Sequence, residues 1–102
     1  MDRVAMLSEI LEQNPNDAFA RYGLAMEYSN QGATDKALSE FGKLLAVHPD
    51  YTAGYFMAAQ TLLRANRTDD ARKMLEDGIR SAMRTGNGHA QSEMEGLLSE
   101  LG

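Results

Sequence analysis

Two similar segments of the sequence indicate the fold. The segment Ser29–Phe41 reads SNQGATDKALSEF, and the segment Leu63–Leu75 reads LRANRTDDARKML. In each, a Gly or Asn, which tolerates a left-handed backbone, stands two residues before Thr-Asp. An Ala is followed four residues later by a large apolar residue. The two prolines, Pro15 and Pro49, stand 34 residues apart, which is the offset between the segments. The chain therefore repeats a structural unit.

Each unit is predicted to contain two helices. After Pro15, Asn16 can cap a first helix, which ends where Gly32 supplies a left-handed residue. Thr34 can cap a second helix, which carries an apolar stripe and ends before Pro49. The repeated segment is then the turn between two antiparallel helices together with the start of the second.

The second unit repeats these signals. Asn66 replaces Gly32, Thr68 replaces Thr34 as the cap, and Asp35 and Asp69 fall in first turns, where negative charge favours the helix dipole. The residues predicted to form the core of the first helices are Leu24, Ala25, Tyr28, Ala58, Ala59 and Leu62. Both units therefore predict the same antiparallel helix pair.

The pattern resembles the tetratricopeptide repeat family, whose 34-residue helix–turn–helix unit carries Trp-x2-Leu-Gly-x2-Tyr, Ala-x3-Phe and Pro. In the first unit these places hold Arg21, Leu24, Ala25, Tyr28, Ala37, Phe41 and Pro49. Arg21 and Ala25 depart from the pattern. The second unit follows it in residue size, with Met83 in place of the closing Pro. The resemblance implies an all-α fold of antiparallel helix–turn–helix repeats stacked as a right-handed superhelix.

One domain, residues 1–102, is expected. It divides into a half repeat (2–14), a first repeat (16–49), a second repeat (50–83) and a capping helix (89–101), after a helix that continues to about Thr85. The initial Met1, the cap-like last helix and the terminal Gly102 favour a complete small protein. About three repeats are usually needed for stability, so this array is short, and formation of a homodimer would add stability.

Composition excludes several classes of function. The net charge of −5 disfavours nucleic acid as a partner, since an acidic surface repels phosphates. No apolar run reaches the ~18 residues of a membrane span. The absence of cysteine excludes disulfides and fits a reducing compartment, so a cytoplasmic protein is predicted.

No constellation of residues indicates catalysis. Neither histidine, His48 or His89, has a second His at the helical spacing of metal ligands, and Gly86-Asn87-Gly88 lacks the Lys-Ser/Thr ending of a phosphate-binding loop. No serine has a plausible histidine base. We therefore expect neither an enzyme nor a bound metal or cofactor.

The resemblance implies a concave groove, lined by the first helix of each unit, that binds a protein or peptide partner. The predicted partner-binding residues are Phe19, Tyr22, Met26, Asn30, Phe56, Met57, Gln60 and Arg64, with Ser29 and Ala53 nearby. Some family members bind a C-terminal carboxylate with a clamp of polar residues, and apolar residues occupy many of those positions in this chain. No carboxylate clamp is therefore predicted. An apolar groove suits a helical or extended segment. Alternatively these stripes belong to the core, or the groove of a self-associating subunit is filled by the last helix or a second copy.

Overall fold

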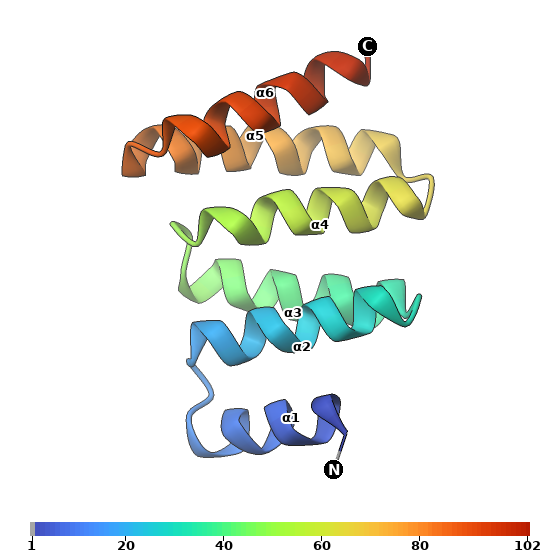
Figure 1. The fold of residues 1–102 in the computed structure, drawn as a ribbon, viewed down its shortest axis with the longest axis vertical. Helices are drawn as coiled ribbons and strands as arrows, with labels where there is room; N and C mark the ends of the chain where they lie inside the picture. Colours follow the sequence, from blue (N-terminus) through green and yellow to red (C-terminus); the bar gives the residue numbers. More distant parts are fainter. Residues whose placement is uncertain (1) are drawn as a thin grey trace.

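Helices joined by short turns make up the chain in the computed structural model, which describes residues 2–102. Met1, with which the predicted domain starts, lies outside the described residues. The helices lie across the long axis of the stack, and consecutive helices run in opposite directions (Figure 1). Their bounds are α1 Arg3–Gln13, α2 Ala18–Asn30, α3 Thr34–Val47, α4 Thr52–Arg64, α5 Thr68–Thr85 and α6 Gly88–Glu100.

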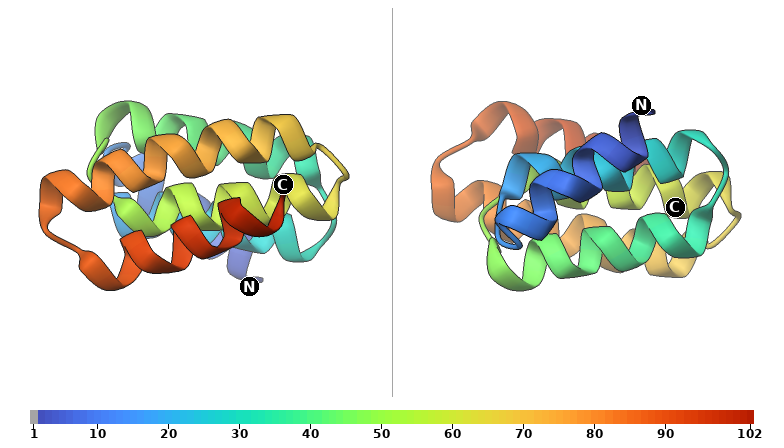
Figure 2. Two further views of the ribbon diagram at one scale, coloured as in Figure 1. Left: turned by 90° about the horizontal axis from the view of Figure 1, so that it is seen from above. Right: turned by 90° about the horizontal axis from the view of Figure 1, so that it is seen from below.

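The helices form two layers. Helices α2, α4 and α6 lie in one layer and α3 and α5 in the other, while α1 closes the N-terminal end against α2 (Figure 2). Every helix packs against its neighbours in the chain, and α4 also touches α2 and α6. The molecule measures 41 × 29 × 18 Å, with its long axis along the stack. Because contacts join only nearby helices, each pair depends on the next pair for cover.

The helix-ending turns confirm the sequence prediction. Gly32 and Asn66 both have left-handed backbones, with φ of 78° and 61°. In each turn, the amide of the following residue reaches back to the helix: Ala33 N–H donates to Tyr28 O and Arg67 N–H to Leu62 O, both at 2.9 Å. A third turn of this kind, at Gly86, ends α5 after Thr85, as predicted.

The predicted helix caps were wrong by one residue. Asp17, not Asn16, caps α2, and its Oδ1 accepts a hydrogen bond from Ala20 N–H at 2.9 Å. Thr34 and Thr68 are the first helical residues instead of caps, because the tight left-handed turns bring the chain into helix at once. Asp35 and Asp69 lie in first turns, as predicted.

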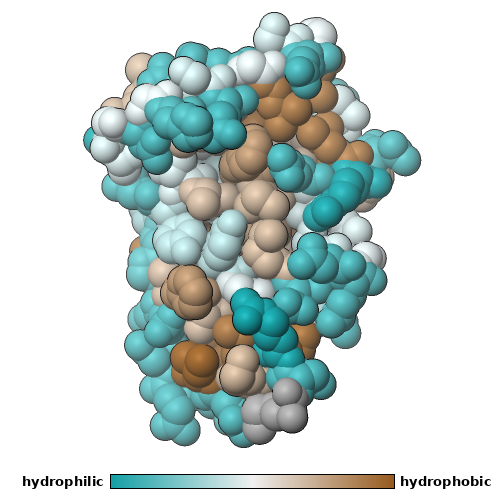
Figure 3. Space-filling model, in the orientation of Figure 1, coloured by the Kyte–Doolittle hydropathy of each residue, from teal (hydrophilic) through white to brown (hydrophobic). Residues whose placement is uncertain are grey.

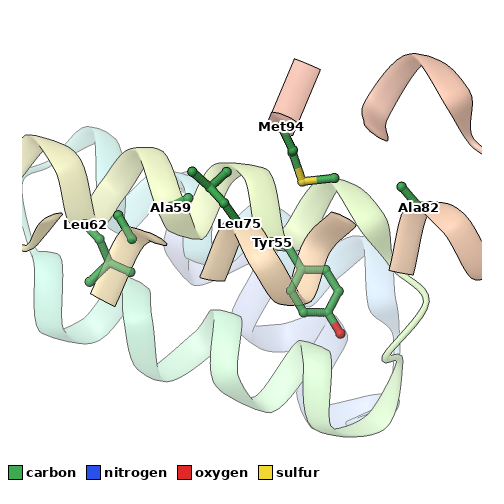
Figure 4. Packing of buried hydrophobic residues seen from close by; sticks show 7 residues of the cluster. Tyr55, Ala59, Leu62, Leu75, Ala82 and Met94 are labelled. Atoms are coloured by element: carbon green, nitrogen blue, oxygen red, sulfur yellow. The ribbon is translucent and has the colours of Figure 1, made fainter. Parts of the chain in front are cut away.

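Small residues let the two layers approach closely. Ala25, Ala58 and Ala59 are fully buried, and Leu24 and Leu62 are nearly so, which confirms five of the six predicted core residues; Tyr28 is half-buried. The core cluster nearest the C-terminus joins three helices, with α6 contributing Met94 (Figure 4). Helix α6 is therefore integral to the core.

Candidate partner-binding face

The surface formed by α2, α4 and α6 is called the front face here, and it faces the reader in Figures 1 and 3. The predicted groove residues belong to two of its helices: Phe19, Tyr22, Met26 and Asn30 to α2, and Phe56, Met57, Gln60 and Arg64 to α4. Apolar colours gather in the upper middle of this face and again near its lower end, with hydrophilic residues between and around them (Figure 3). The two predicted sets thus come from helices that touch each other.

The predicted groove residues differ in depth. Phe19 is 73% exposed, and Asn30 and Arg64 are also exposed. The other members of the set are half-buried: Tyr22, Met26, Phe56, Met57 and Gln60. Half-burial means that these side chains both support the core and present part of their surface to solvent.

Tyr22 belongs to an aromatic group at the junction of α2, α3 and α4. Its ring centroid lies 6.4 Å from that of Phe41, edge to face, and 5.3 Å from that of Tyr51. Burial, and then the neighbouring Tyr51, raise the pKa of Tyr22 above its usual value of 10.0. Burial likewise raises the pKa of Tyr51. Both phenols are neutral at physiological pH.

The methionines bridge core and surface. Met26 and Met57 pack against the buried cluster that contains Ala25, Phe41 and Ala58. Phe56 packs against the C-terminal cluster and lines a pocket of about 230 Å³ between α4 and α6. Ala90, Glu93 and Met94 of α6 form part of the wall of that pocket, together with other residues of the two helices.

Helix α6 extends the front face. It packs on α5 and touches α4, and it makes no contact with α2 within residues 2–102. The seam between α2 and α4 therefore stays uncovered by the chain's own last helix. Among the predicted groove residues, Phe56 lines a pocket together with residues of α6.

The C-terminal end of the α2–α4 seam is polar. Ser29 and Thr61 are buried, and their hydroxyl oxygens lie 2.8 Å apart. Arg64 donates to Ser29 Oγ, and a pocket of about 350 Å³ opens beside these residues. Ser29, expected to line the groove, thus lies beneath it. Sequence reasoning missed Thr61, although a hydroxyl among the apolar residues of α4 was the signal.

Arg21 occupies the position of the family's Trp and replaces its packing with charge. Its Nη1 lies 2.6 Å from Glu40 Oε1, and its Nη2 donates to Pro15 O at 2.9 Å. At the equivalent position of the second unit, the Tyr55 hydroxyl donates to Pro49 O at 2.7 Å. Different side chains thus tie each first helix to the preceding proline.

The histidines belong to no group of three metal ligands among the described residues, although Glu93 lies one helical turn after His89. His48 Nε2 lies 2.8 Å from Asn16 O, which links the end of α3 to the turn before α2, and His89 lies 3.2 Å from Glu93 at the surface. Within residues 2–102, no three His, Asp or Glu side chains are close enough to hold a metal ion. In the same range, no helix has the length and apolarity needed to cross a bilayer.

Comparison with known proteins identifies the family. Two sequence profiles described as tetratricopeptide repeat match residues 28–90 and 6–39. A TPR repeat-containing protein of Pseudomonas aeruginosa is 26% identical over 95 residues, which are 93% of this chain and 90% of that protein. The chain belongs to the tetratricopeptide repeat family.

Solved structures agree with this assignment. The solution structure of a tetratricopeptide repeat domain protein from Salinibacter ruber has a TM-score of 0.80 and 32% identity, over 86% of this chain and 89% of that one. A protein from Bordetella parapertussis shares the fold, with a TM-score of 0.84 and 23% identity, over 99% of this chain and 88% of the other. The predicted all-α, right-handed stack of antiparallel helix pairs is confirmed.

Proposed function

We propose that this protein is an interaction module whose front face holds an apolar helical or extended segment of a partner protein. Tetratricopeptide repeats are in general protein-interaction modules, and this chain belongs to that family. The observation that carries the proposal is the row of half-buried aromatic and Met side chains on two adjoining helices. Such side chains give large anchoring area, and Met adapts to irregular partners.

The proposed binding mode does not use a carboxylate clamp. A clamp needs several cationic or amide donors converging on one ligand group. On the seam, Arg64 is the one basic residue among the predicted set, and Asn30 and Gln60 are its polar companions. Apolar contact therefore supplies most of the proposed affinity.

The division into repeats is part of this proposal. We assign residues 2–14 to a half repeat, 16–49 and 50–83 to two repeats, and 89–101 to a capping helix. The outward residues of α6 support the last assignment, because a terminal helix needs a polar outer surface. They are Ser92, Glu93, Glu95, Ser99 and Glu100, all exposed. The proposed compartment is the cytoplasm, which the absence of cysteine fits.

A second candidate function is self-association through the other end of the stack. Met6 and Ile10 are 44% and 40% exposed, and they lie four residues apart on one side of α1. A homodimer that covered these side chains would give a structural subunit. The front face would then remain free or be filled by the second copy.

Charge placed on each surface separates the two candidates. The front-face variant is Met26→Glu/Phe56→Glu, and the matched variant on the exposed side of α1 is Met6→Glu/Ile10→Glu. Both variants are checked for helicity by circular dichroism. Affinity capture from source-cell lysate is expected to lose a heterologous protein with the first variant and keep it with the second. An unchanged set of captured proteins with a folded front-face variant overturns the proposal.

Sedimentation tests the second candidate directly. If the mass of the wild type rises with concentration and the Met6→Glu/Ile10→Glu variant stays monomeric, self-association through α1 is supported. If the wild type has the mass of a single chain at every concentration, self-association through α1 is rejected.

A further inference from the structure

Arg64 has no acidic partner in the part of the chain that the structure describes. Among residues 2–102, ion pairs occupy Arg3, Arg21, Arg67, Arg80 and Arg84. Arg64 donates only to the neutral hydroxyl of Ser29. A guanidinium has five N–H donors, so most of its donors remain free for a ligand. An unpaired arginine on the face proposed to bind a partner is therefore open to an anionic group.

A pair of buried hydroxyl groups supports Arg64 through one hydrogen bond. Thr61 is 3% exposed, and its Oγ1 donates to Met57 O at 2.8 Å. Ser29 is 7% exposed, lies 2.8 Å from Thr61 by their hydroxyl oxygens, and accepts from Arg64. This chain of hydrogen bonds joins α2 to α4. It gives the exposed guanidinium one hydrogen-bond partner before any ligand arrives, which lowers the entropy lost on binding.

The pocket beside Arg64 contains no competing carboxylate. It is lined by Ser29, Asn30, Gly32, Thr34, Thr61 and Arg64. The Asn30 amide adds donors, and the first turn of α3 begins at Thr34 with no side-chain cap on its N–H groups. The C-terminal ends of α2 and α4 and the net charge of −5 act against an anion, so recognition here has to be short-range.

We propose that this pocket binds a carboxylate of the partner segment, an inference that rests on the proposed function. Met57 and Arg64 are seven residues apart on one side of α4, a separation of ~10 Å at 1.5 Å per residue. A fitting partner carries an acidic residue ~10 Å from an apolar anchor, which is about seven residues along a helix or about three along an extended chain. The preferred segment is thus apolar with one acidic residue at a set spacing.

A titration with small carboxylates tests the pocket without a known partner. ¹⁵N-labelled protein is titrated with N-acetyl-aspartate N-methylamide, with the matched asparagine compound, and with N-acetylalanine, which carries only a terminal carboxylate. The aspartate compound is expected to shift the Arg64 Nε–H and the amides of Ser29, Asn30 and Thr61 saturably, while the asparagine compound does not. Saturable shifts with N-acetylalanine but not with the aspartate compound would show that the pocket binds the carboxylate of a chain terminus. They would overturn the proposed acidic residue. Equal shifts with aspartate and asparagine overturn the proposal.

Variants attribute the effect to Arg64. Arg64→Gln keeps the Ser29–Thr61 hydrogen bond and is expected to weaken binding of the aspartate compound at least tenfold, whereas Arg64→Lys keeps part of it. Lys73→Gln, an exposed residue on α5, is the control for the loss of one positive charge. Equal weakening by Arg64→Gln and Lys73→Gln would show a non-specific charge effect and overturn the proposal.

Selection from a random, C-terminally amidated peptide library separates this inference from the proposed function. Wild-type protein is expected to select peptides with Asp or Glu at a fixed spacing from an apolar anchor. Peptides that bind, lose binding to the Met26→Glu/Phe56→Glu variant and show no acidic preference would leave the proposed function standing and reject the carboxylate pocket. Selected peptides that bind the front-face variant as well as the wild type would reject the proposed function. The titration with small carboxylates would then still test whether the pocket binds a carboxylate.

Discussion

Gly78 lies where α5 packs closely against both α4 and α6. A Cβ at this position would lie 2.6 Å from Met94 Sδ and 2.6 Å from Tyr55 Cβ. Met94 can move its flexible end, but Tyr55 Cβ is fixed by the backbone of α4. The absence of a side chain at Gly78 therefore sets how closely α4, α5 and α6 can pack.

The substitution Gly78→Ala is expected to destabilise the protein by about 1–3 kcal/mol, since overpacking outweighs the higher helix propensity of Ala. Gly96→Ala is the control, because Gly96 is exposed on α6 and a Cβ there would meet nothing within 4 Å. That variant is expected to gain about 0.5–1 kcal/mol. Urea unfolding measures both. Equal stability of the two variants would contradict the packing at Gly78.

The tyrosine pair predicts a pH dependence at high pH. Burial raises the pKa of Tyr22 and Tyr51 in the folded state above 10.0, the value in the unfolded chain. At a pH between the unfolded-state and folded-state pKa values, the folded protein therefore binds more protons than the unfolded chain. Stability is therefore fully present below pH ~10 and falls as the pH rises through the folded-state pKa values. Unfolding followed from pH 8 to 11 should show a steeper loss for wild type than for Tyr22→Phe/Tyr51→Phe. Parallel curves would refute the contribution of these phenols.

At the scale of the element, the two helix pairs solve one packing problem with different chemistry. Arg21 and Glu40 form a largely buried ion pair between α2 and α3, and Tyr55 and Met74 stand at the positions 34 residues later. Both Arg21 and Tyr55 donate to the carbonyl of the proline before their helix. In this hydrogen bond, the tyrosine of the second unit corresponds to the arginine of the first.

Replacing one member of the ion pair is expected to be worse than replacing both. Glu40→Met alone leaves a largely buried guanidinium without its carboxylate and should cost about 2–3 kcal/mol. The double variant Arg21→Tyr/Glu40→Met reproduces the second unit and should lie within about 1 kcal/mol of wild type, because well-packed apolar groups often equal a buried ion pair. Urea unfolding of the single and double variants measures the coupling. Additive losses would show that the two positions are independent.

At the scale of the whole molecule, stability should fall toward the N-terminal end of the stack. Helix α1 packs only against α2, whereas α4 packs against four other helices. Amide hydrogen exchange is therefore expected to be roughly tenfold or more faster in α1 than in α4, because end units open without unfolding the rest. Uniform protection from α1 to α6 would instead indicate one cooperative unit.

Local signals predicted most of the helical framework. Gly32, Asn66 and Gly86 stop helices because their backbones take the left-handed conformation, which is a property of a residue and its immediate neighbours. The periodic apolar residues likewise indicated which side of each helix is buried. The errors at Asn16, Thr34 and Thr68 were single-residue errors, because the turn geometry that selects the capping residue depends on more than residue type.

The sequence also placed the candidate site on α2 and α4, since a 34-residue spacing fixes which helices share a layer. It could not give the depth of each side chain: Phe19 is exposed while Tyr22 is held between Phe41 and Tyr51. Nor could it show that α6 leaves the α2–α4 seam uncovered. Depth and cover depend on how closely helices approach, which side-chain volumes from several elements decide together.

What the sequence by itself determined is therefore the repeat, the helix order and the apolar sides, all of which follow from short-range backbone preferences and periodicity. Only the tertiary structure decided that Ser29 meets Thr61 across two helices and that Arg64 lies beside them with no acidic partner among residues 2–102. Ser29 and Thr61 are 32 residues apart in sequence. Their contact depends on the packing of α2 against α4, and no local pattern in the sequence encodes that distance.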